Sequence, residues 1–215
     1  MTLTEFSTLF DVLYNNISSN QAPGLTEYEK SVFLTQAQEA VILDLYKGTA
    51  GDSFETTEEV TRYLSSLVTT HSNTHLTSSD FMFNTKESKV SLPPDVLFIT
   101  YQAAQVDGRD VIVVPTRQDS LYKDLNNPFK GPNKNRILCL SEENGITLYS
   151  QSDVDKYYMK YLYKPYPIIL EGAYAESGLT INGKADSEEV DWLPESLHTQ
   201  ILLRAVQIAK AVWQS

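Results

Sequence analysis

Two histidines have a spacing that could bind a metal ion. His71 and His75 are four residues apart, which on a helix would place both imidazoles on one side, as in a zinc site. The third histidine and the single cysteine are far along the chain, and the local sequence is rich in Ser, Thr and Asn. A polar loop or a helix end is the favoured interpretation, and we expect no metal and no cofactor.

Cys139 is the only cysteine, so the chain cannot form an internal disulfide. Its neighbours Ile137, Leu138 and Leu140 predict that it is a small buried hydrophobic residue. A reactive nucleophile is the alternative, but the nearby sequence supplies no basic partner to activate the thiol.

His198 lies three residues after Glu195 and is a candidate general base. A histidine that faces solvent or an interface is the simpler interpretation. The pairs Glu58–Glu59 and Glu188–Glu189 are adjacent in sequence, so their side chains diverge on a helix or a strand. The sequence has no Walker A loop, G-x-G-x-x-G or G-x-S-x-G motif, and we expect no catalytic residues.

The chain carries 17 basic and 28 acidic residues, a formal charge of −11. This balance argues against tight duplex binding, which needs a cationic face, but an acidic wall would let DNA slide past. The 215 residues fit one domain, or one domain with an appended subdomain. No apolar run is long enough for a membrane span, and residues 1–6 lack signal-peptide features, so we expect a cytosolic protein without membrane contact.

Basic and aromatic residues gather in and just after residues 118–135. They are Tyr122, Lys123, Phe129, Lys130, Lys134 and Arg136. Such a group can be a solvated loop, can dock on an acidic partner, or can contact DNA. The chain also has 13 tyrosines, more than a small core needs, and tyrosine is enriched at protein interfaces.

Helical periodicity marks both ends of the chain. Residues 3–17 place Phe6 and Phe10 on one face, after a Thr2–Glu5 capping box. A second box, Thr26–Glu29, opens a helix that should end before Gly48. Its predicted inner face comprises Val32, Phe33, Gln36, Ala40 and Leu43. A third helix is predicted from Thr56, with Val60, Leu64, Leu67 and Val68 on its apolar face. A last helix is predicted from Pro194 to Trp213, with an apolar stripe of Leu197, Ile201, Leu202, Ala205, Val206, Ile208, Ala209 and Val212.

The middle of the chain reads as strands. Residues 96–101 and 111–114 should pair across the Asp107–Gly108 turn, and residues 136–140 and 146–150 across Asn144–Gly145. Residues 118–135 form a loop long enough to be functional.

A further strand, residues 156–164, should have a basic wet face and an aromatic face. The aromatic face carries Tyr157, Met159, Tyr161 and Tyr163 and is either buried or meets a partner.

These elements predict an α+β fold in which the N- and C-terminal helices pack as a small bundle beside a central antiparallel β-rich region. We expect an N-terminal helical segment at 1–72 and a β-rich middle at 73–170. Residues 171–215 should form an acidic loop and a helix that packs on the N-terminal helices.

Three segments carry a resemblance to a known family. They are Phe10–Asn16 with Ser19–Leu25, Glu27–Lys30 and Phe33–Gln38; Tyr163–Ile169; and Leu193–His198 with Arg204–Lys210. In these segments the chain resembles the head-to-tail adaptor or ring proteins of short-tailed bacteriophages, most closely those of crAss-like phages.

The resemblance implies a structural subunit of a homo-oligomeric ring, commonly twelvefold, beneath the portal protein. The ring would join capsid to tail, touch neighbouring tail or ring proteins, and pass DNA through its lumen without specific binding. It would be assembled in the host cytoplasm and located at the portal vertex of the virion. The alternatives are a small hydrolase-like enzyme made during infection and a nucleic-acid regulator.

The expected interface residues follow from this function. They are the loop contacts Tyr122, Phe129, Lys130 and Lys134, the strand tyrosines Tyr157, Tyr161 and Tyr163, and Trp213 as a C-terminal docking anchor.

Overall fold

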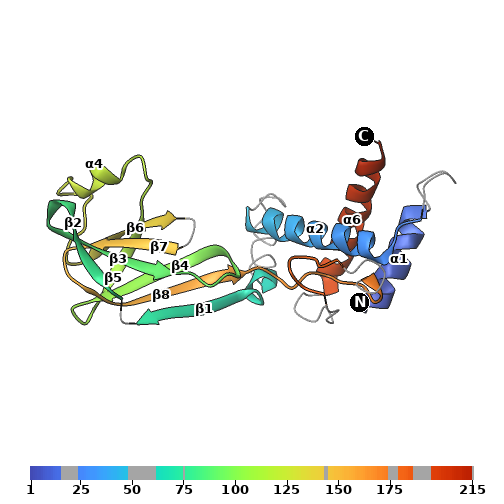
Figure 1. Ribbon diagram of the computed structural model, residues 1–215, viewed down its shortest axis with the longest axis horizontal. Coiled ribbons are helices and arrows are strands. Elements are labelled where there is room, and N and C mark those ends of the chain that lie inside the picture. The colour runs from blue at the N-terminus through green and yellow to red at the C-terminus, as the bar shows by residue number, and fades with distance from the viewer. Residues whose placement is uncertain are drawn as a thin grey trace. The chain divides into compact units, whose positions relative to one another are not determined.

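The computed structural model describes residues 1–15, 24–47, 62–74, 76–142, 145–173, 179–185 and 195–214. They form two compact units, a helical unit of Met1–Leu67 with Pro165–Ser215 and a sheet unit of Val68–Lys164 (Figure 1). Helices flank a strand-rich middle, which confirms the predicted α+β class.

The helical unit contains α1 (Leu3–Asn15), α2 (Glu27–Tyr46) and α6 (Glu195–Gln214), with α6 packed against both other helices. Both predicted capping boxes are present. At α2 the Thr26 hydroxyl accepts from the Glu29 backbone N–H, and the Glu29 carboxylate accepts from the Thr26 N–H. At α1, Thr2 and Glu5 make the same exchange. The predicted starts at Thr56 and Pro194 lie outside the described residues.

The predicted stripe of α6 is confirmed for most of its length. It buries Leu197, Ile201, Leu202, Ala205, Val206 and Ala209. Val212, in the last turn, is exposed instead.

The buried face of α2 is not the predicted one. The predicted inner face is half-buried or exposed, and the helix instead buries Ser31, Leu34, Thr35, Gln38, Val41, Ile42 and Leu45. Three of these residues are polar, and for that reason apolar periodicity pointed to the wrong side. Their burial is explained by what they bind.

The polar residues of this face hold an extended segment, residues 166–170, along the helix. The Leu170 N–H donates to the Ser31 hydroxyl oxygen at 2.9 Å, the Thr35 hydroxyl donates to the Ile168 carbonyl at 3.4 Å, and the Gln38 amide donates to the Tyr166 carbonyl at 3.0 Å. Side chains that are four and three residues apart on the helix therefore bond to every second residue of the extended segment. The backbone groups of this segment have no neighbouring strand, and the side chains of α2 supply the hydrogen-bond partners that buried backbone groups need.

A buried ammonium group connects α1 to α2. Lys30 Nζ lies 2.6 Å from the Asp11 carboxylate and 2.9 Å from that of Glu27, and it donates to the Ser7 hydroxyl at 3.3 Å. Burial alone would lower the pKa of Lys30, but the hydrogen bonds that its ammonium donates to Asp11 and Glu27 outweigh burial and raise the pKa. Removing either partner would leave a charge in a poorly solvated place.

The sheet unit is one curled, eight-stranded sheet. Its strands are β1 (Val68–Thr74), β2 (Ser78–Phe81), β3 (Thr85–Ser91), β4 (Val96–Val106), β5 (Arg109–Pro115), β6 (Arg136–Glu142), β7 (Gly145–Ser150) and β8 (Val154–Tyr163). The spatial order is β1-β8-β4-β5-β6-β7-β3-β2, and β5 with β6 is the parallel pair in this otherwise antiparallel sheet. The predicted pairing of β6 with β7 is confirmed. β4 also pairs with β5, but through Ala103–Val106 rather than through the predicted residues 96–101, which pair with β8. Val68, expected on a helix face, instead begins β1.

The parallel pair explains the long loop. Parallel neighbours cannot be joined by a tight hairpin and need a crossover of about a dozen residues or more. Residues 116–135, here called the crossover loop, make that connection and contain the short helix α4 (Leu121–Leu125). The 118–135 loop predicted from sequence is therefore partly helical.

The tight turn between β4 and β5 is the predicted one. Asp107 and Gly108 have φ values of 50° and 72°, and Val106 pairs with Arg109. Positive φ at both central residues is the type I′ geometry that favours Asp-Gly.

Candidate functional site

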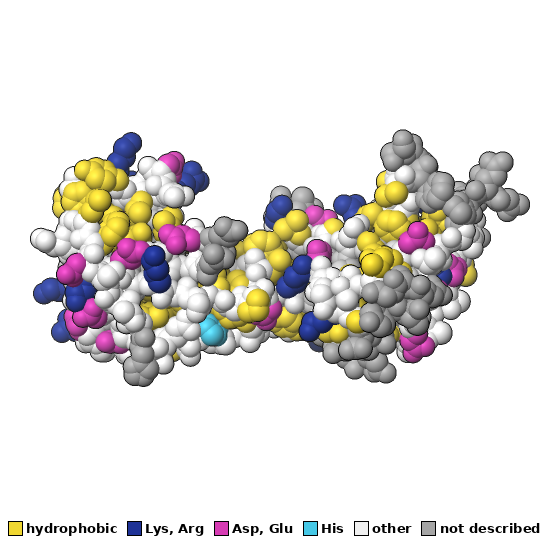
Figure 2. All heavy atoms as spheres, in the orientation of Figure 1, with side chains coloured by type: hydrophobic (Ala, Val, Ile, Leu, Met, Phe, Trp, Pro, Cys, Tyr) yellow, Lys and Arg dark blue, Asp and Glu magenta, His cyan; other side chains and the backbone are white. Residues whose placement is uncertain are grey.

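The largest exposed hydrophobic side chains of the sheet unit include a group that we call the aromatic tip: Met82, Phe83, Tyr122 and Phe129. Their exposed fractions are 58%, 39%, 63% and 87%. Figure 2 shows hydrophobic side chains gathered at the end of the unit where Figure 1 labels α4, with Lys and Arg side chains close by. Exposed apolar groups bordered by charge are typical of protein interaction sites.

Met82 and Phe83 belong to a single 3-10 turn, η1 (Met82–Asn84), that joins β2 to β3. Phe83 and Asn84 have φ values of 57° and 54°, in the left-handed region that costs a non-glycine residue about 1–2 kcal/mol. The Thr85 hydroxyl donates to the Met82 carbonyl at 2.6 Å and holds the turn closed. Strain of this kind is found at functional sites, where it presents a side chain in a required position.

The crossover loop places Tyr122 beside this turn. The rings of Phe83 and Tyr122 have centroids 5.1 Å apart and meet edge to face at 72°. Below them, Leu125 packs with Leu138, Leu140 and Tyr149 in a separate small core. Burial raises the pKa of Tyr149 to about 12, with the nearby carboxylates of Glu87 and Glu142 adding to the shift. The tip is therefore supported by the sheet.

Hydrogen bonds fix the rest of the loop. The Asp124 carboxylate accepts from the hydroxyls of Thr116 at 2.9 Å and Ser120 at 3.0 Å, and these bonds lower the pKa of Asp124. The Arg136 guanidinium donates to the carbonyls of Phe129 at 2.6 Å and Gly131 at 2.7 Å. Phe129 is thus exposed on a fixed backbone, which lowers the entropy cost of using it as a contact.

The crossover loop carries the four residues predicted as loop contacts, Tyr122, Phe129, Lys130 and Lys134, and all four are exposed. Sequence reasoning missed Met82 and Phe83. The available signal was the run Phe81-Met82-Phe83 between polar residues, which no core periodicity explains.

The predicted strand tyrosines lie elsewhere. Tyr157 is fully buried, and its hydroxyl donates to the Gln102 side chain at 2.8 Å; burial raises its pKa. Tyr161 is buried with its hydroxyl 3.3 Å from the Asp95 carboxylate. This face was predicted either to be buried or to meet a partner. Tyr157 and Tyr161 are both buried within the sheet unit, so neither exposes a side chain to a partner. Tyr163 is half-buried, and the side chain of Trp213 is outside the described part of the structure.

The two candidate catalytic groups, Cys139 and His198, belong to different units. Burial raises the pKa of the Cys139 thiol to about 12, so it is not a ready nucleophile. His198 was expected at the surface but is buried in the other unit, packed on Phe6 with ring centroids 5.4 Å apart. Its Nδ1 lies 2.9 Å from the N-terminal amine.

Contrary to the prediction from the sequence, His71 does not lie in a polar loop or at a helix end. It lies on strand β1, where residues four apart do not have the geometry of a helical metal site. The His71 Nε2 is 2.7 Å from the Asn73 side-chain oxygen. His75 lies outside the described residues. Among those that are described, no three His, Cys, Asp or Glu side chains are placed to hold a metal.

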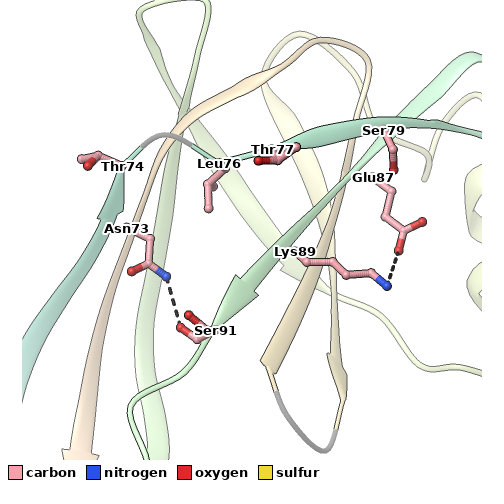
Figure 3. A pocket seen from close by; sticks show the side chains of 8 residues that line it. All are labelled: Asn73, Thr74, Leu76, Thr77, Ser79, Glu87, Lys89 and Ser91. Atoms are coloured by element: carbon pink, nitrogen blue, oxygen red, sulfur yellow. Dashed lines mark hydrogen bonds and ion pairs between the residues drawn. The ribbon is translucent and has the colours of Figure 1, made fainter.

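A groove of about 500 Å³ lies between the end of β1 and strands β2 and β3 (Figure 3). Among its lining residues, Glu87 and Lys89 pair at 3.7 Å and Asn73 donates to the Ser91 carbonyl at 3.2 Å. Neither Cys139 nor His198 lines this groove. Its polar groups bind one another rather than facing a common point where a substrate could react.

The chain's net negative charge comes from one of the two units. The helical unit has 6 basic and 17 acidic residues, a balance of −11, whereas the sheet unit has 11 of each. In the described part of the chain, no helix is long and apolar enough to cross a membrane.

Comparison with known proteins decides the family. The model of the family described as phage tail ring protein 3/4 matches residues 1–215. The chain belongs to this family. It is 41% identical to ring protein 3 of Bacteroides phage crAss001, over 97% of this chain and 95% of the relative. It is 34% identical to ring protein 4/5 of the same phage, over 100% and 94%.

The resemblance to crAss-like phage ring proteins is therefore confirmed, and the chain is a structural component of the phage tail and of the virion. The family and both relatives are named for a structural ring, which confirms that the chain is not an enzyme.

Proposed function

We propose that this chain is the repeating subunit of a head-to-tail connector ring that lies beneath the portal protein and joins the capsid to the tail. The observation that carries the proposal is the match of residues 1–215 to phage tail ring proteins. The rigid aromatic tip supports it, because a ring subunit needs fixed surfaces for its neighbours.

The ring is homo-oligomeric and twelvefold, like the ring implied by the family resemblance. Copies contact one another head to tail, so each copy uses two different surfaces, and rotation closes the ring. Subunits assemble in the host cytoplasm. The contacts with the portal and with neighbouring tail or ring proteins use the exposed residues Tyr122, Phe129, Lys130 and Lys134, the half-buried Tyr163, and Trp213 near the end of α6.

DNA passes through the lumen without specific binding. A channel for ejection must not hold the phosphate backbone, and the −11 charge of the helical unit repels it. The balanced charge of the sheet unit adds no net attraction. Tight duplex binding by the isolated chain at low salt would count against this part of the proposal.

The test is a cryo-electron microscopy reconstruction of purified particles, focused on the portal vertex. We expect a ring of density between portal and tail into which the helical and sheet units each fit as separate bodies. Density for this chain on the capsid surface, or at the far end of the tail, would show that the ring is not a connector.

A further inference from the structure

One face of the sheet unit carries no acidic side chain. It belongs to β1, β8 and β4, which are neighbours at one edge of the sheet (Figure 1). Residues directly opposite one another on paired strands share a face. Pairing with β8 gives three such rows, which we call the β8 face: Thr70–Lys160–Tyr101, Ser72–Tyr158–Ala103 and Thr74–Lys156–Gln105. The alternate residues Tyr157 and Met159 are buried in the core, so the β8 face is on the opposite side of the sheet.

The β8 face is accessible to a partner. Six of its nine residues are exposed and the other three are half-buried. Among the described residues, no carboxylate lies within 4 Å of the ammonium group of Lys156 or Lys160. The sheet unit contains 11 acidic residues, and none of them is on this face. The face therefore attracts an anionic partner, although its unit as a whole has no net charge.

The side-chain types of the β8 face fit a phosphate backbone. Lys, Ser, Thr, Tyr and Gln are side chains that hydrogen-bond to phosphate oxygens, and eight of the nine residues are of these types. Protein contacts instead gather apolar side chains at their centre. The central row has no large aliphatic side chain, and the exposed Ile112 lies beyond the face, on β5 opposite Ala103. A nucleic acid is therefore favoured over a protein partner.

We infer that the β8 face lines the channel of the ring and contacts the backbone of duplex DNA as the DNA passes. The inference rests on the proposed function and specifies which surface faces the DNA. Two lysines in each copy displace about two counterions, so the logarithm of the affinity of one copy falls with the logarithm of the salt concentration with a slope of about −2. Contacts to phosphate carry no sequence information. A contact of this size guides a duplex without holding it, as a channel for ejection requires.

Formaldehyde cross-linking of purified phage particles arrested during DNA ejection tests the inference. The reagent joins a lysine ammonium to an amino group of a DNA base only when the two are in close contact. After digestion with nuclease and protease, the peptides that carry a nucleotide are sequenced. DNA linked to the portal protein of the same particles shows that the duplex is in the channel. We expect a nucleotide on Lys156 or Lys160.

Particles that carry both Lys156→Gln and Lys160→Gln should lose most of the DNA-linked chain. The matched control carries Lys89→Gln and Lys123→Gln, two exposed lysines of the same unit that lie outside the β8 face, and it should keep the link. Equal losses in the two kinds of particle would contradict the inference.

Three further results would overturn the inference while leaving the ring intact. The first is a nucleotide on other residues of the chain and not on Lys156 or Lys160. The second is a link from these two lysines to protein and not to DNA. The third is DNA linked to the portal protein but not to this chain. Failure of the proposed function looks different, because the reconstruction would then show no ring of this chain between portal and tail.

Discussion

The ring of Phe83 packs edge-on against the ring of Tyr122, with centroids 5.1 Å apart, although the two residues come from different connections of the sheet. Phe83 is in the turn between β2 and β3, and Tyr122 is in the crossover from β5 to β6. Each connection alone would expose an isolated aromatic side chain. Together they make a shared surface, and the strain at Phe83 is part of how that surface is formed.

That strain can be measured by two substitutions at one position. Both Phe83→Ala and Phe83→Gly remove the ring, but only glycine accepts a φ of 57° without cost. We expect the glycine variant to be more stable than the alanine variant by about 1 kcal/mol in urea unfolding. The matched control is the pair Ser79→Ala and Ser79→Gly on strand β2. In a strand glycine is the destabilising residue, so there the alanine variant should be more stable than the glycine variant. Equal stabilities at Phe83 would show that the turn stores no strain.

Tyr122→Ala should impair assembly and leave the fold intact. The side chain is 63% exposed, so its loss should change the free energy of unfolding by less than about 1 kcal/mol. As an anchor it should lower the fraction of chain in rings about tenfold or more. The measurement is sedimentation of the full chain co-expressed with portal and neighbouring ring proteins. Tyr101→Ala, on β4 and 57% exposed, is the control that should assemble normally. Equal effects of the two variants would remove the special role of the tip.

The polar face of α2 should be required for stability. Ser31→Ala removes the acceptor of the Leu170 N–H, which stays buried, and an unsatisfied buried donor costs about 1–3 kcal/mol. Thermal unfolding should show this loss in the variant. Ser65→Ala, which removes an exposed hydroxyl bonded to the Arg62 carbonyl, should be nearly neutral. An unchanged unfolding free energy for Ser31→Ala would mean that the segment 166–170 is held by apolar packing alone.

Acid should loosen the crossover loop through Asp124. Hydrogen bonds from Thr116 and Ser120 lower its pKa in the folded chain below the ordinary value of 3.8. The stability that this carboxylate contributes is therefore present above the unfolded-state pKa and is lost as pH falls through the folded-state value. Wild type should lose more stability than Asp124→Asn between about pH 5 and pH 2, measured as melting temperature against pH. Parallel curves for the two proteins would contradict this linkage.

The sequence predicted the elements whose local signals agree with their surroundings. The capping boxes at Thr2 and Thr26, the Asp107–Gly108 turn and the pairing of β6 with β7 belong to this group. Each is determined within a few residues. Strands β1 to β3 were missed because residues 68–91 are mostly Ser, Thr, Asn and charged residues, and their strand state comes from pairing with β8 and β7.

The other features that the sequence did not predict depend on contacts between residues far apart in the chain. The inner face of α2 is polar because residues 166–170 bind to it, more than 120 positions away. The aromatic tip could be predicted in part, since Tyr122 and Phe129 stand among lysines in a long polar loop. For Phe83 the one sequence signal was the run Phe81-Met82-Phe83, and its exposure depends on a left-handed turn that the sequence around it does not favour.

The central claim is that this chain forms one ring at the portal vertex, and the most direct test is its copy number in purified particles. Quantitative mass spectrometry with isotope-labelled peptides, referred to the portal protein of the same particles, gives that number. About a dozen copies per particle, in a one-to-one ratio with the portal protein, is the result that we predict. Hundreds of copies would place the chain on the capsid surface or inside the head, and its absence from particles would contradict the structural role altogether.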